Sequence, residues 1–354
     1  MTTTMMAAVY YGPGELRLEE RPLPIPRSDE VLLRVTRSGM CGTDASEWKS
    51  GPLIFPVKKA HPTSGHFGPM VMGHEFIGEV VGVGSAVDVI LVGDRVASGA
   101  GISCGKCARC LEGRTNLCKQ YVTLGLNRDG GMAEYVAVPA TTLKKIPEDL
   151  SDDEAGLAQP LAVGIHAARR ARAQNGDTIV IIGAGAIGTF VLAGLNYLAE
   201  VSSIVVDFDG PRLDRARRLG ATHVVPVAEN TEDELRNFVG ENGADIVIEA
   251  SGAPGQMQRA LSWVRRGGTL LQVGLPSTPP ELDVHHAVMS EITIETTLAH
   301  VCGKDLEPAL EILATTSLGQ ELLEGVFALD NLESQLNELA SGNIKGKVLF
   351  DPSR

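Results

Sequence analysis

Residues 178–188 read TIVIIGAGAIG, and this stretch decides the fold of the second half of the chain. Its first five residues are apolar or β-branched and predict a buried strand, and a G-x-G-x-x-G pattern opens the helix-like segment that follows. In that context Gly183 permits the tight turn, Gly185 lets a pyrophosphate approach the backbone, and Gly188 lets the helix pack on the strand. We therefore predict a dinucleotide site whose phosphates face the helix N-terminus, formed by Gly183, Gly185, Ala186, Ile187 and Gly188.

An acidic residue follows the next predicted strand. Asp207 comes directly after the run 203–206, nineteen residues after Gly188. A carboxylate there can accept hydrogen bonds from the ribose hydroxyls of the adenosine and repels a 2′-phosphate, so NAD is the expected cofactor. Arg212 lies close enough in sequence to reach the ribose or a phosphate, which keeps NADP open. The alternative to a dinucleotide site is a glycine-rich turn without a ligand.

Predicted strands and helices alternate from about residue 151, which is typical of a parallel sheet covered by helices. The residues before it form short predicted strands separated by Pro and Gly, and the C-terminal tail ends in a predicted strand at 347–350. We expect an α/β fold with two domains. A β-rich domain spans 1–159 and is completed by 300–354, and a doubly wound parallel-sheet domain spans 160–299.

The composition is that of a globular protein. The chain has 354 residues, 44% of them apolar, and a formal net charge of −13. This charge argues against nucleic acid or an anionic membrane as a partner. The N-terminus has no basic start followed by an apolar core, so a cytoplasmic protein is expected. Residues 178–199 carry no charge, but glycines interrupt them, and we expect no membrane span.

Four cysteines lie in one short segment with the spacing C-x2-C-x2-C-x7-C: Cys104, Cys107, Cys110 and Cys118. Without a secretory signal, such spacing indicates metal ligation rather than disulfides. Four thiolates complete a tetrahedral zinc site and leave no position for water, so the predicted role is structural. A redox-active CxxC pair and an iron–sulfur cluster are the alternatives.

Two other short motifs carry a second possible metal site. They are GMCGTD at 39–44 and GHE at 73–75, each between apolar runs. Cys41, His74 and Glu75 together suit an open zinc site, in which a substrate oxygen takes a free position. The alternative is a buried cysteine and a histidine that only forms structural hydrogen bonds.

Together these motifs resemble, in order and over nearly the whole chain, the zinc-dependent medium-chain alcohol dehydrogenases. The stretches 51–75 and 159–167 are most similar to the branch of sorbitol and (R,R)-2,3-butanediol dehydrogenases. The resemblance implies a GroES-like catalytic domain, a Rossmann dinucleotide-binding domain, and a homodimer or homotetramer.

The resemblance also implies roles for individual residues. Cys41 and His74 would be ligands of a catalytic zinc, Glu75 a further ligand or an exchanging acid, and Gln159 the remaining protein ligand. Thr43 would accept or pass the proton of the substrate hydroxyl. The four clustered cysteines would hold a structural zinc. The nicotinamide side would be lined by Val273, Gly274, Leu275, Thr297, Leu298 and Ala299.

Four positions depart from the family pattern. Gln159 stands where a Glu is common, and a neutral ligand leaves the metal more electrophilic. Ser46 replaces a histidine of the usual proton relay. His300 replaces a frequent Tyr and is either the missing proton carrier, with an unperturbed pKa of ~6.5, or a surface histidine. Glu47 replaces an aromatic residue, and with Gln159 it favours a hydroxyl-rich substrate.

The expected function is hydride transfer between NAD and a secondary alcohol, a vicinal diol or a polyol, with one catalytic and one structural zinc. A dehydrogenase of aldoses or cyclic polyols is the alternative in the same class. The alternative in another class is a catalytically weakened protein that binds NAD and zinc, which the changes at Ser46 and Gln159 would favour.

Overall fold

The computed structural model describes residues 3–354 and separates into two compact units. Unit 1 runs to Ala162 and includes Val301–Arg354, and unit 2 is Val163–His300. The boundary lies inside helix α4 (Ala158–Ala171). The C-terminal tail therefore belongs to the same unit as the N-terminal strands.

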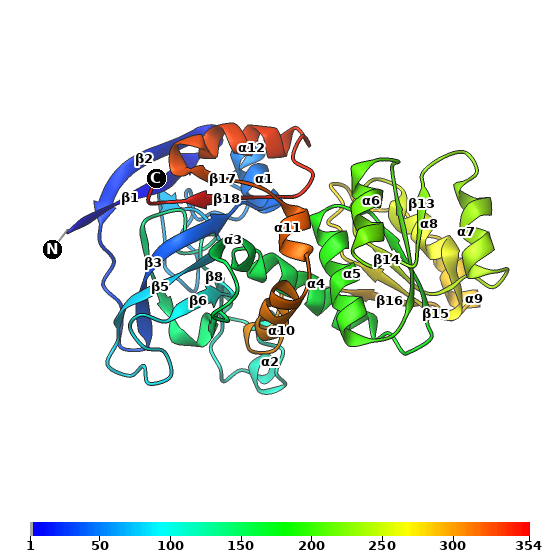
Figure 1. Cartoon of the computed structure of the whole chain (residues 1–354), viewed down its shortest axis with the longest axis horizontal. Helices are drawn as coiled ribbons and strands as arrows, with labels where there is room; N and C mark the ends of the chain where they lie inside the picture. Colours follow the sequence, from blue (N-terminus) through cyan, green and yellow to red (C-terminus); the bar gives the residue numbers. More distant parts are fainter. Residues whose placement is uncertain (1–2) are drawn as a thin grey trace. The chain divides into compact units, whose positions relative to one another are not determined.

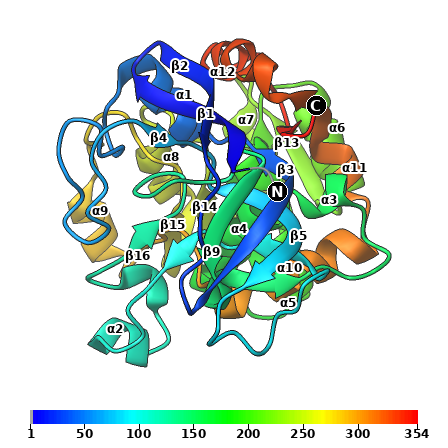
Figure 2. The same ribbon diagram turned by 90° about the vertical axis from the view of Figure 1, so that its left-hand side faces the viewer.

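Unit 1 is built on β-sheets (Figure 1). One sheet has the order β2-β1-β4, and a larger one has the order β10-β6-β5-β3-β18-β17, with β9 paired to β3. Figure 2 shows β3 and β9 side by side. The strands are β1 (Thr4–Gly12), β2 (Glu15–Pro22), β3 (Glu30–Gly39), β4 (Met70–Val71), β5 (Glu75–Val83), β6 (Arg95–Ser98), β7 (Gly101–Ile102), β8 (Val122–Thr123), β9 (Tyr135–Pro139), β10 (Leu143–Lys145), β17 (Leu323–Ala328) and β18 (Lys347–Asp351).

Short helices connect these strands. They are α1 (Gly42–Ser50), α2 (Ala108–Leu111), η1 (Thr115–Leu117), η2 (Ala140–Thr142), α3 (Asp152–Ala155), α10 (Cys302–Thr315), α11 (Leu318–Leu322), η3 (Leu329–Asn331) and α12 (Leu332–Ala340). Helix α3 begins after Ser151, whose hydroxyl accepts a hydrogen bond from the Glu154 N–H, and three acidic residues in its first turn favour this start.

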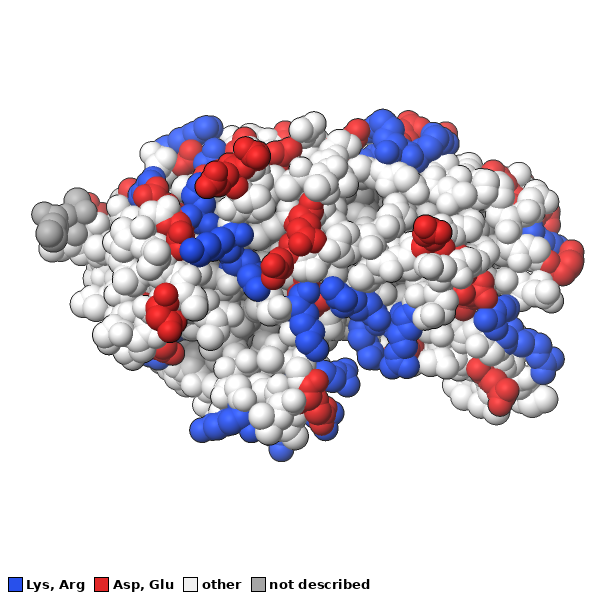
Figure 3. Space-filling model, turned by 60° about the horizontal axis from the view of Figure 1, so that its bottom comes forward, with Lys and Arg blue, Asp and Glu red and all other residues white. Residues whose placement is uncertain are grey.

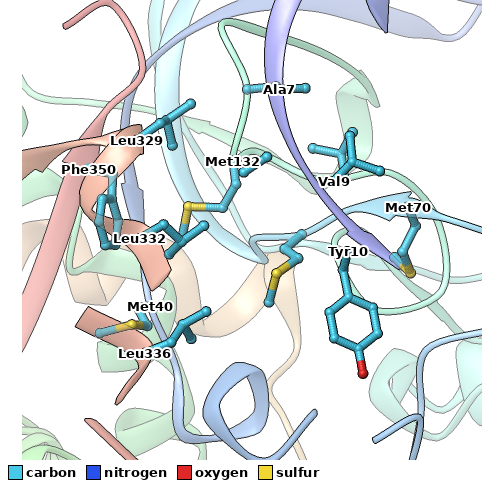
Figure 4. Close-up of a cluster of buried hydrophobic side chains, with 14 of the residues drawn as sticks. Ala7, Val9, Tyr10, Met40, Met70, Met132, Leu329, Leu332, Leu336 and Phe350 are labelled. Atoms are coloured by element: carbon cyan, nitrogen blue, oxygen red, sulfur yellow. The ribbon is translucent and has the colours of Figure 1, made fainter. Parts of the chain in front are cut away.

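A buried cluster joins the two ends of the chain in unit 1 (Figure 4). Tyr10 from β1, Met40 after β3, Leu336 from α12 and Phe350 from β18 all lie in it. Burying each such side chain stabilises the fold by ~1.5–3 kcal/mol. Met40 directly precedes Cys41, so this core fixes the backbone next to a predicted metal ligand.

Unit 2 is a six-stranded parallel sheet with the order β13-β12-β11-β14-β15-β16 (Figure 1). Its strands are β11 (Thr178–Ile182), β12 (Ser202–Asp207), β13 (His223–Pro226), β14 (Ala244–Glu249), β15 (Val264–Gln272) and β16 (Thr293–Thr296). Its helices after α4 are α5 (Ala186–Leu198), α6 (Pro211–Arg218), α7 (Thr231–Val239), α8 (Gln256–Trp263) and α9 (Val284–Met289).

Alternation along the strands places helices on both faces of this sheet. Ile179 and Ile181 pack in one core with α5 and α6, whereas Val180 and Ile182 pack in another with α7, α8 and α9. Successive strand residues point to opposite faces, so a strand buried on both sides is apolar at nearly every position. The expected α/β fold with a doubly wound parallel sheet is confirmed.

The surface carries charges of both signs. On the face shown in Figure 3, Lys and Arg side chains alternate with groups of Asp and Glu. Among residues 3–354, no helix is both long and apolar enough to cross a membrane.

Candidate functional site

Cys41, His74 and Glu75 come together in unit 1. One ligand atom from each, a thiolate sulfur, an imidazole nitrogen and a carboxylate oxygen, lies within 4.8 Å of the others. His74 and Glu75 are almost fully buried. Within the described chain, His74 Nδ1 is buried without a hydrogen-bond partner. A thiolate, an imidazole and a carboxylate at this spacing fit a zinc ion.

Two glycines make room for this cluster. A Cβ on Gly39 would lie 2.5 Å from Glu75 Oε2, and one on Gly73 would lie 2.6 Å from Met132 Cγ. Gly73 also has φ +93°, which favours glycine. Cys41 precedes α1, where its own N–H donates to Asp44 Oδ2 at 2.9 Å and fixes the start of the helix.

Charged side chains lie close to both His74 and Glu75. Asp44 Oδ1 lies 3.7 Å from His74 Nδ1. Burial alone would lower the pKa of His74, but the charges of Asp44 and Cys41 raise it well above its ordinary value. Lys347 Nζ, also buried, lies 2.5 Å from Glu75 Oε2 and donates to the Met40 carbonyl. The lysine neutralises a carboxylate that would otherwise be buried without a counter-charge.

The four clustered cysteines form a second group in unit 1. Their sulfurs lie 3.5 Å (Cys107–Cys110), 3.9 Å (Cys107–Cys118) and 4.0 Å (Cys104–Cys110) apart. A tetrahedral ZnS₄ site with Zn–S of about 2.3 Å has S···S edges of about 3.8 Å, so the group fits zinc. All four are free thiols, and no disulfide joins them.

The glycine-rich turn of unit 2 gives each glycine a different environment. Gly183 has φ +101°, and a Cβ on Gly188 would lie 1.8 Å from the Gly183 carbonyl oxygen. A Cβ on Gly185, by contrast, has nothing within 4 Å. Helix α5 starts after Gly185 with Ala186 and Ile187 in its first turn. The backbone at Gly185 thus leaves room for an anion to bind at this helix N-terminus.

Asp207 ends β12 beside this turn. Its Oδ2 accepts the Ala184 N–H at 2.7 Å and its Oδ1 accepts the Phe208 N–H at 2.7 Å. Each carboxylate oxygen keeps a further lone pair for a ribose hydroxyl. Arg212 Nη1 lies 4.0 Å from Asp207 Oδ2, and about a third of its side chain is exposed.

Comparisons with known proteins agree with this geometry. Residues 27–148 match the model of the alcohol dehydrogenase GroES-like domain, and residues 186–315 match that of zinc-binding dehydrogenases. A sorbitol dehydrogenase from Bacillus subtilis (strain 168) is 39% identical over 276 residues, which are 77% of this chain and 76% of that protein. The chain belongs to the zinc-dependent medium-chain alcohol dehydrogenase family.

Other members of the family match the whole chain. An L-threonine 3-dehydrogenase from Burkholderia thailandensis is 32% identical over 351 residues, 98% of each chain. The crystal structure of 2R,3R-butanediol dehydrogenase from Bacillus subtilis has a TM-score of 0.89 and 28% identity, and the match covers 98% of this chain and 99% of that one. This chain is thus an oxidoreductase acting on CH–OH groups, and its unit 1 contains a GroES-like domain.

Relatives of known structure differ in the cofactor they hold. An alcohol dehydrogenase from Escherichia coli CFT073 is complexed with NADH (TM-score 0.88, 25% identity, covering 99% of this chain and 100% of that one). A protein described as a zinc-binding dehydrogenase from Sinorhizobium meliloti 1021 is bound to NADP. It has a TM-score of 0.86 and 27% identity, and the match covers 99% of this chain and 100% of that one. Membership of the family therefore implies a nicotinamide dinucleotide and leaves the choice between the two to residues such as Asp207.

The structure also shows where three other residues of the expected metal site or its proton path lie. Thr43 Oγ1 lies 3.8 Å from Cys41 Sγ. Gln159 is buried in the first turn of α4. The Ser46 hydroxyl donates to the Gly42 carbonyl oxygen of its own helix at 2.9 Å, an ordinary backbone contact within α1.

Glu47 faces inward, and its interpretation as a residue favouring a hydroxyl-rich substrate is wrong. Its side chain is fully buried, and the carboxylate accepts N–H groups of Leu53, Ile54 and Phe55. A fully buried carboxylate held by three backbone donors is not available to a sugar hydroxyl. The residue therefore shapes the loop after α1.

The residues expected on the nicotinamide side follow two neighbouring strands of unit 2. Val273, Gly274 and Leu275 come directly after β15, and Thr297, Leu298 and Ala299 come directly after β16. Parallel strands end at the same edge of a sheet, so both groups share the edge with the glycine-rich turn. His300 is 1% exposed, which excludes the alternative of a surface histidine.

Proposed function

We propose that the chain oxidises secondary alcohols, vicinal diols or polyols with NAD. In this proposal residues 1–159 with 300–354 form the catalytic domain, and 160–299 form the dinucleotide-binding domain. The observation that carries the proposal is the meeting of ligand atoms from Cys41, His74 and Glu75 within 4.8 Å in a member of the zinc-dependent family.

In the proposed site Cys41 and His74 hold the catalytic zinc, with Glu75 and Gln159 as candidates for the remaining protein ligand. A zinc ion bound there acts as a Lewis acid and lowers the pKa of an alcohol, as it does for water. Thr43, 3.8 Å from Cys41 Sγ, takes up and passes on the proton of the hydroxyl. Glu75, neutralised by Lys347, adds little net charge to the site. We also propose His300 as a proton carrier, since it is a buried imidazole and Ser46 cannot serve.

NAD is the proposed cofactor. The main support is Asp207, whose two oxygens can each accept a ribose hydroxyl and whose charge repels a 2′-phosphate. The pyrophosphate would lie against Gly183, Gly185 and Gly188, with Arg212 near the ribose.

A second zinc is proposed on Cys104, Cys107, Cys110 and Cys118, in a structural role. Their S···S spacing supports it, and with four protein ligands no position is left for a substrate. Thiols kept free for a metal suit a reducing compartment, so we propose a cytoplasmic location.

A homodimer or homotetramer is proposed as the assembly. Unit 2 leaves apolar side chains exposed on α9 and on the edge strand β16, among them Val288 at 68% and Ile294 at 41%. An unpaired edge strand with apolar neighbours favours contact with a second copy. Light scattering of the protein and of a Val288→Asp variant tests this, and a wild-type monomer would contradict it.

A dehydrogenase of aldoses or cyclic polyols is the second candidate. Gln159 favours it, because a neutral amide at this position departs from the pattern of the polyol branch.

Steady-state assays with a substrate panel test the proposal. The panel contains sorbitol, 2,3-butanediol stereoisomers, L-threonine and glucose, each with NAD and with NADP, and the reduced nicotinamide is followed by absorbance. Turnover of a diol or polyol with NAD is expected. Preference for glucose would support the second candidate, and zinc and NADH binding without any turnover would support a catalytically weakened protein.

A further inference from the structure

A buried carboxylate connects the two turns that follow β14 and β15. Glu249, the last residue of β14, is 1% exposed. Its Oε1 accepts the N–H groups of Ser251 at 2.8 Å and Gly252 at 3.0 Å, and also the Ser251 hydroxyl. Glu249 therefore holds the first turn of the loop after its own strand.

The same carboxylate reaches the neighbouring strand. Gln272, which ends β15 and is the register partner of Glu249, donates through Nε2 to Glu249 Oε2 at 2.6 Å. That nitrogen also donates to the Gly274 carbonyl at 2.7 Å. The Glu249 carbonyl accepts the N–H groups of Val273 and Gly274. Both turns are thus tied to Glu249 and Gln272, the second of them through the Glu249 carbonyl as well as through side chains.

The two turns also touch without intervening side chains. A Cβ on Gly274 would lie 2.2 Å from the Gly252 nitrogen and 2.7 Å from Glu249 Oε2. A Cβ on Gly252, where φ is +65°, would lie 2.8 Å from the Leu275 carbonyl oxygen. Because the backbones are in contact, any shift of one turn displaces the other.

Space is available for such a shift. A cavity of about 390 Å³ is lined by Glu249, Gly252 and Gln272 together with the segment 276–281. Residues 276–281 are exposed. Beside this cavity, the hydrogen bonds of the Glu249 and Gln272 side chains act with the backbone bonds to the Glu249 carbonyl to hold the turns.

We infer that Glu249 and Gln272 are positioning residues for the nicotinamide half of the dinucleotide. The inference rests on the proposed function, in which Val273, Gly274 and Leu275 line the nicotinamide. The pair holds this segment against Gly252 in the conformation that receives the ring. The adenosine half depends on Asp207 and the glycine-rich turn, to which the side chains of Glu249 and Gln272 make no hydrogen bond in the described structure.

Glu249→Gln is a sharp test because the replaced atom, Oε2, has defined partners: it accepts from Gln272 Nε2 and, at 3.1 Å, from the Gly252 N–H. An amide nitrogen in place of Oε2 faces the Gln272 Nε2 donor, and two donors cannot bond. If the Gln272 amide rotates to accept from the new donor, its oxygen comes to face the Gly274 carbonyl. In either arrangement one of the bonds that hold the second turn is lost.

The experiment compares NADH with ADP-ribose, which lacks the nicotinamide, by calorimetry on the zinc-loaded full chain. Glu249→Gln is expected to raise the Kd for NADH by about tenfold or more and to change the Kd for ADP-ribose by about twofold at most. Asp245→Asn is the matched control. Asp245 lies near the other end of β14, where it accepts from the Thr178 N–H and from Arg265, so its loss should leave the ratio of the two Kd values unchanged.

The two Kd values decide whether Glu249 and Gln272 position the nicotinamide half. Equal weakening of both ligands, or no weakening of either, would overturn the positioning role while leaving dinucleotide binding intact. A wild-type protein that binds neither ligand would overturn the proposed function, and the inference with it. If Glu249→Gln does not fold, Gln272→Met carries the test, since it removes only the bonds to Glu249 Oε2 and Gly274, and the same change in ratio is expected.

Discussion

At the scale of single residues, the Thr43 hydroxyl is the group that we propose to transfer the substrate proton. Thr43→Ala should lower kcat by a factor of about 10²–10⁴, because a positioned proton-transfer group is lost. Zinc content should not change, since Thr43 supplies no ligand atom. Steady-state kinetics together with metal analysis of the same preparation measure both quantities.

Thr43→Ser is the control for this variant. It keeps the hydroxyl near Cys41 Sγ and should retain most of the turnover. Unaltered kcat in Thr43→Ala, or a loss of zinc with it, would remove Thr43 from the proton path.

The four clustered thiols differ in acidity, and this gives a pH-dependent prediction. Hydrogen bonds from the N–H groups of Cys110 and Lys119 lower the pKa of Cys107 to about 6, whereas burial raises the pKa of Cys118 to about 11. In zinc-free protein near pH 7, Cys107 is mostly thiolate and Cys118 mostly thiol, and only the thiolate is alkylated rapidly. Mass mapping after brief iodoacetamide treatment should find Cys107 modified well before Cys118. Faster modification of Cys118 would contradict these acidities.

How far the sequence predicts the site depends on the distance in sequence between its residues. The cysteine group lies within one loop, so spacing alone predicts the convergence that the sulfur distances show. The pairing of Glu75 with Lys347 does not follow from the sequence, because it depends on β18 joining β3 at the far end of the chain. The signal that the sequence offers is a lysine at the first position of a buried, otherwise mostly apolar strand. The role of Glu47 does not follow from the sequence for a similar reason, since its partners are backbone groups that only the folded loop brings to it.

At the scale of elements, the turn between β11 and α5 separates packing from ligand binding. Gly188→Ala places a methyl group 1.8 Å from the Gly183 carbonyl oxygen and should destabilise the protein by about 3 kcal/mol or more. Gly185→Ala has open space around it and should change the free energy of unfolding by only about 0.5 kcal/mol. Denaturant titrations of both variants measure this difference.

The same pair of variants tests the ligand. A methyl group on Gly185 occupies the approach of a pyrophosphate, so Gly185→Ala should raise the Kd for ADP-ribose by roughly tenfold or more, ~1.4 kcal/mol. A stable Gly185→Ala protein with wild-type affinity would mean that the turn binds no dinucleotide.

The sequence predicts those helices and strands that have a strong local pattern of apolar residues. The alternation of strands and helices from β11 to β15 follows from apolar runs and glycine punctuation. The edge strand β16 gives no such signal, because TIET contains one apolar residue and three of its four side chains are exposed. It becomes a strand by pairing with β15, which is a tertiary effect.

At the scale of the whole molecule, the two kinds of site belong to different units. Both groups of candidate metal ligands lie in unit 1, and the glycine-rich turn and Asp207 lie in unit 2. The net charge of −13 is compatible with an anionic dinucleotide, because the proposed recognition uses local N–H groups at a helix N-terminus. Loss of a metal should therefore leave dinucleotide binding largely intact.

Cys41→Ala and Cys107→Ala test this independence together. Each variant should lose one of two bound zinc ions, because each removes a ligand from a separate group. Cys41→Ala should abolish turnover while binding ADP-ribose as the wild type does. Cys107→Ala should instead lower the thermal midpoint, since the loop 104–118 loses the metal that holds it.

Cys302→Ala replaces a buried cysteine outside both groups, and it is the control that should keep both ions. Elemental analysis, calorimetry and thermal unfolding measure the three quantities, and simultaneous loss of both zinc ions from either ligand variant would contradict two independent sites.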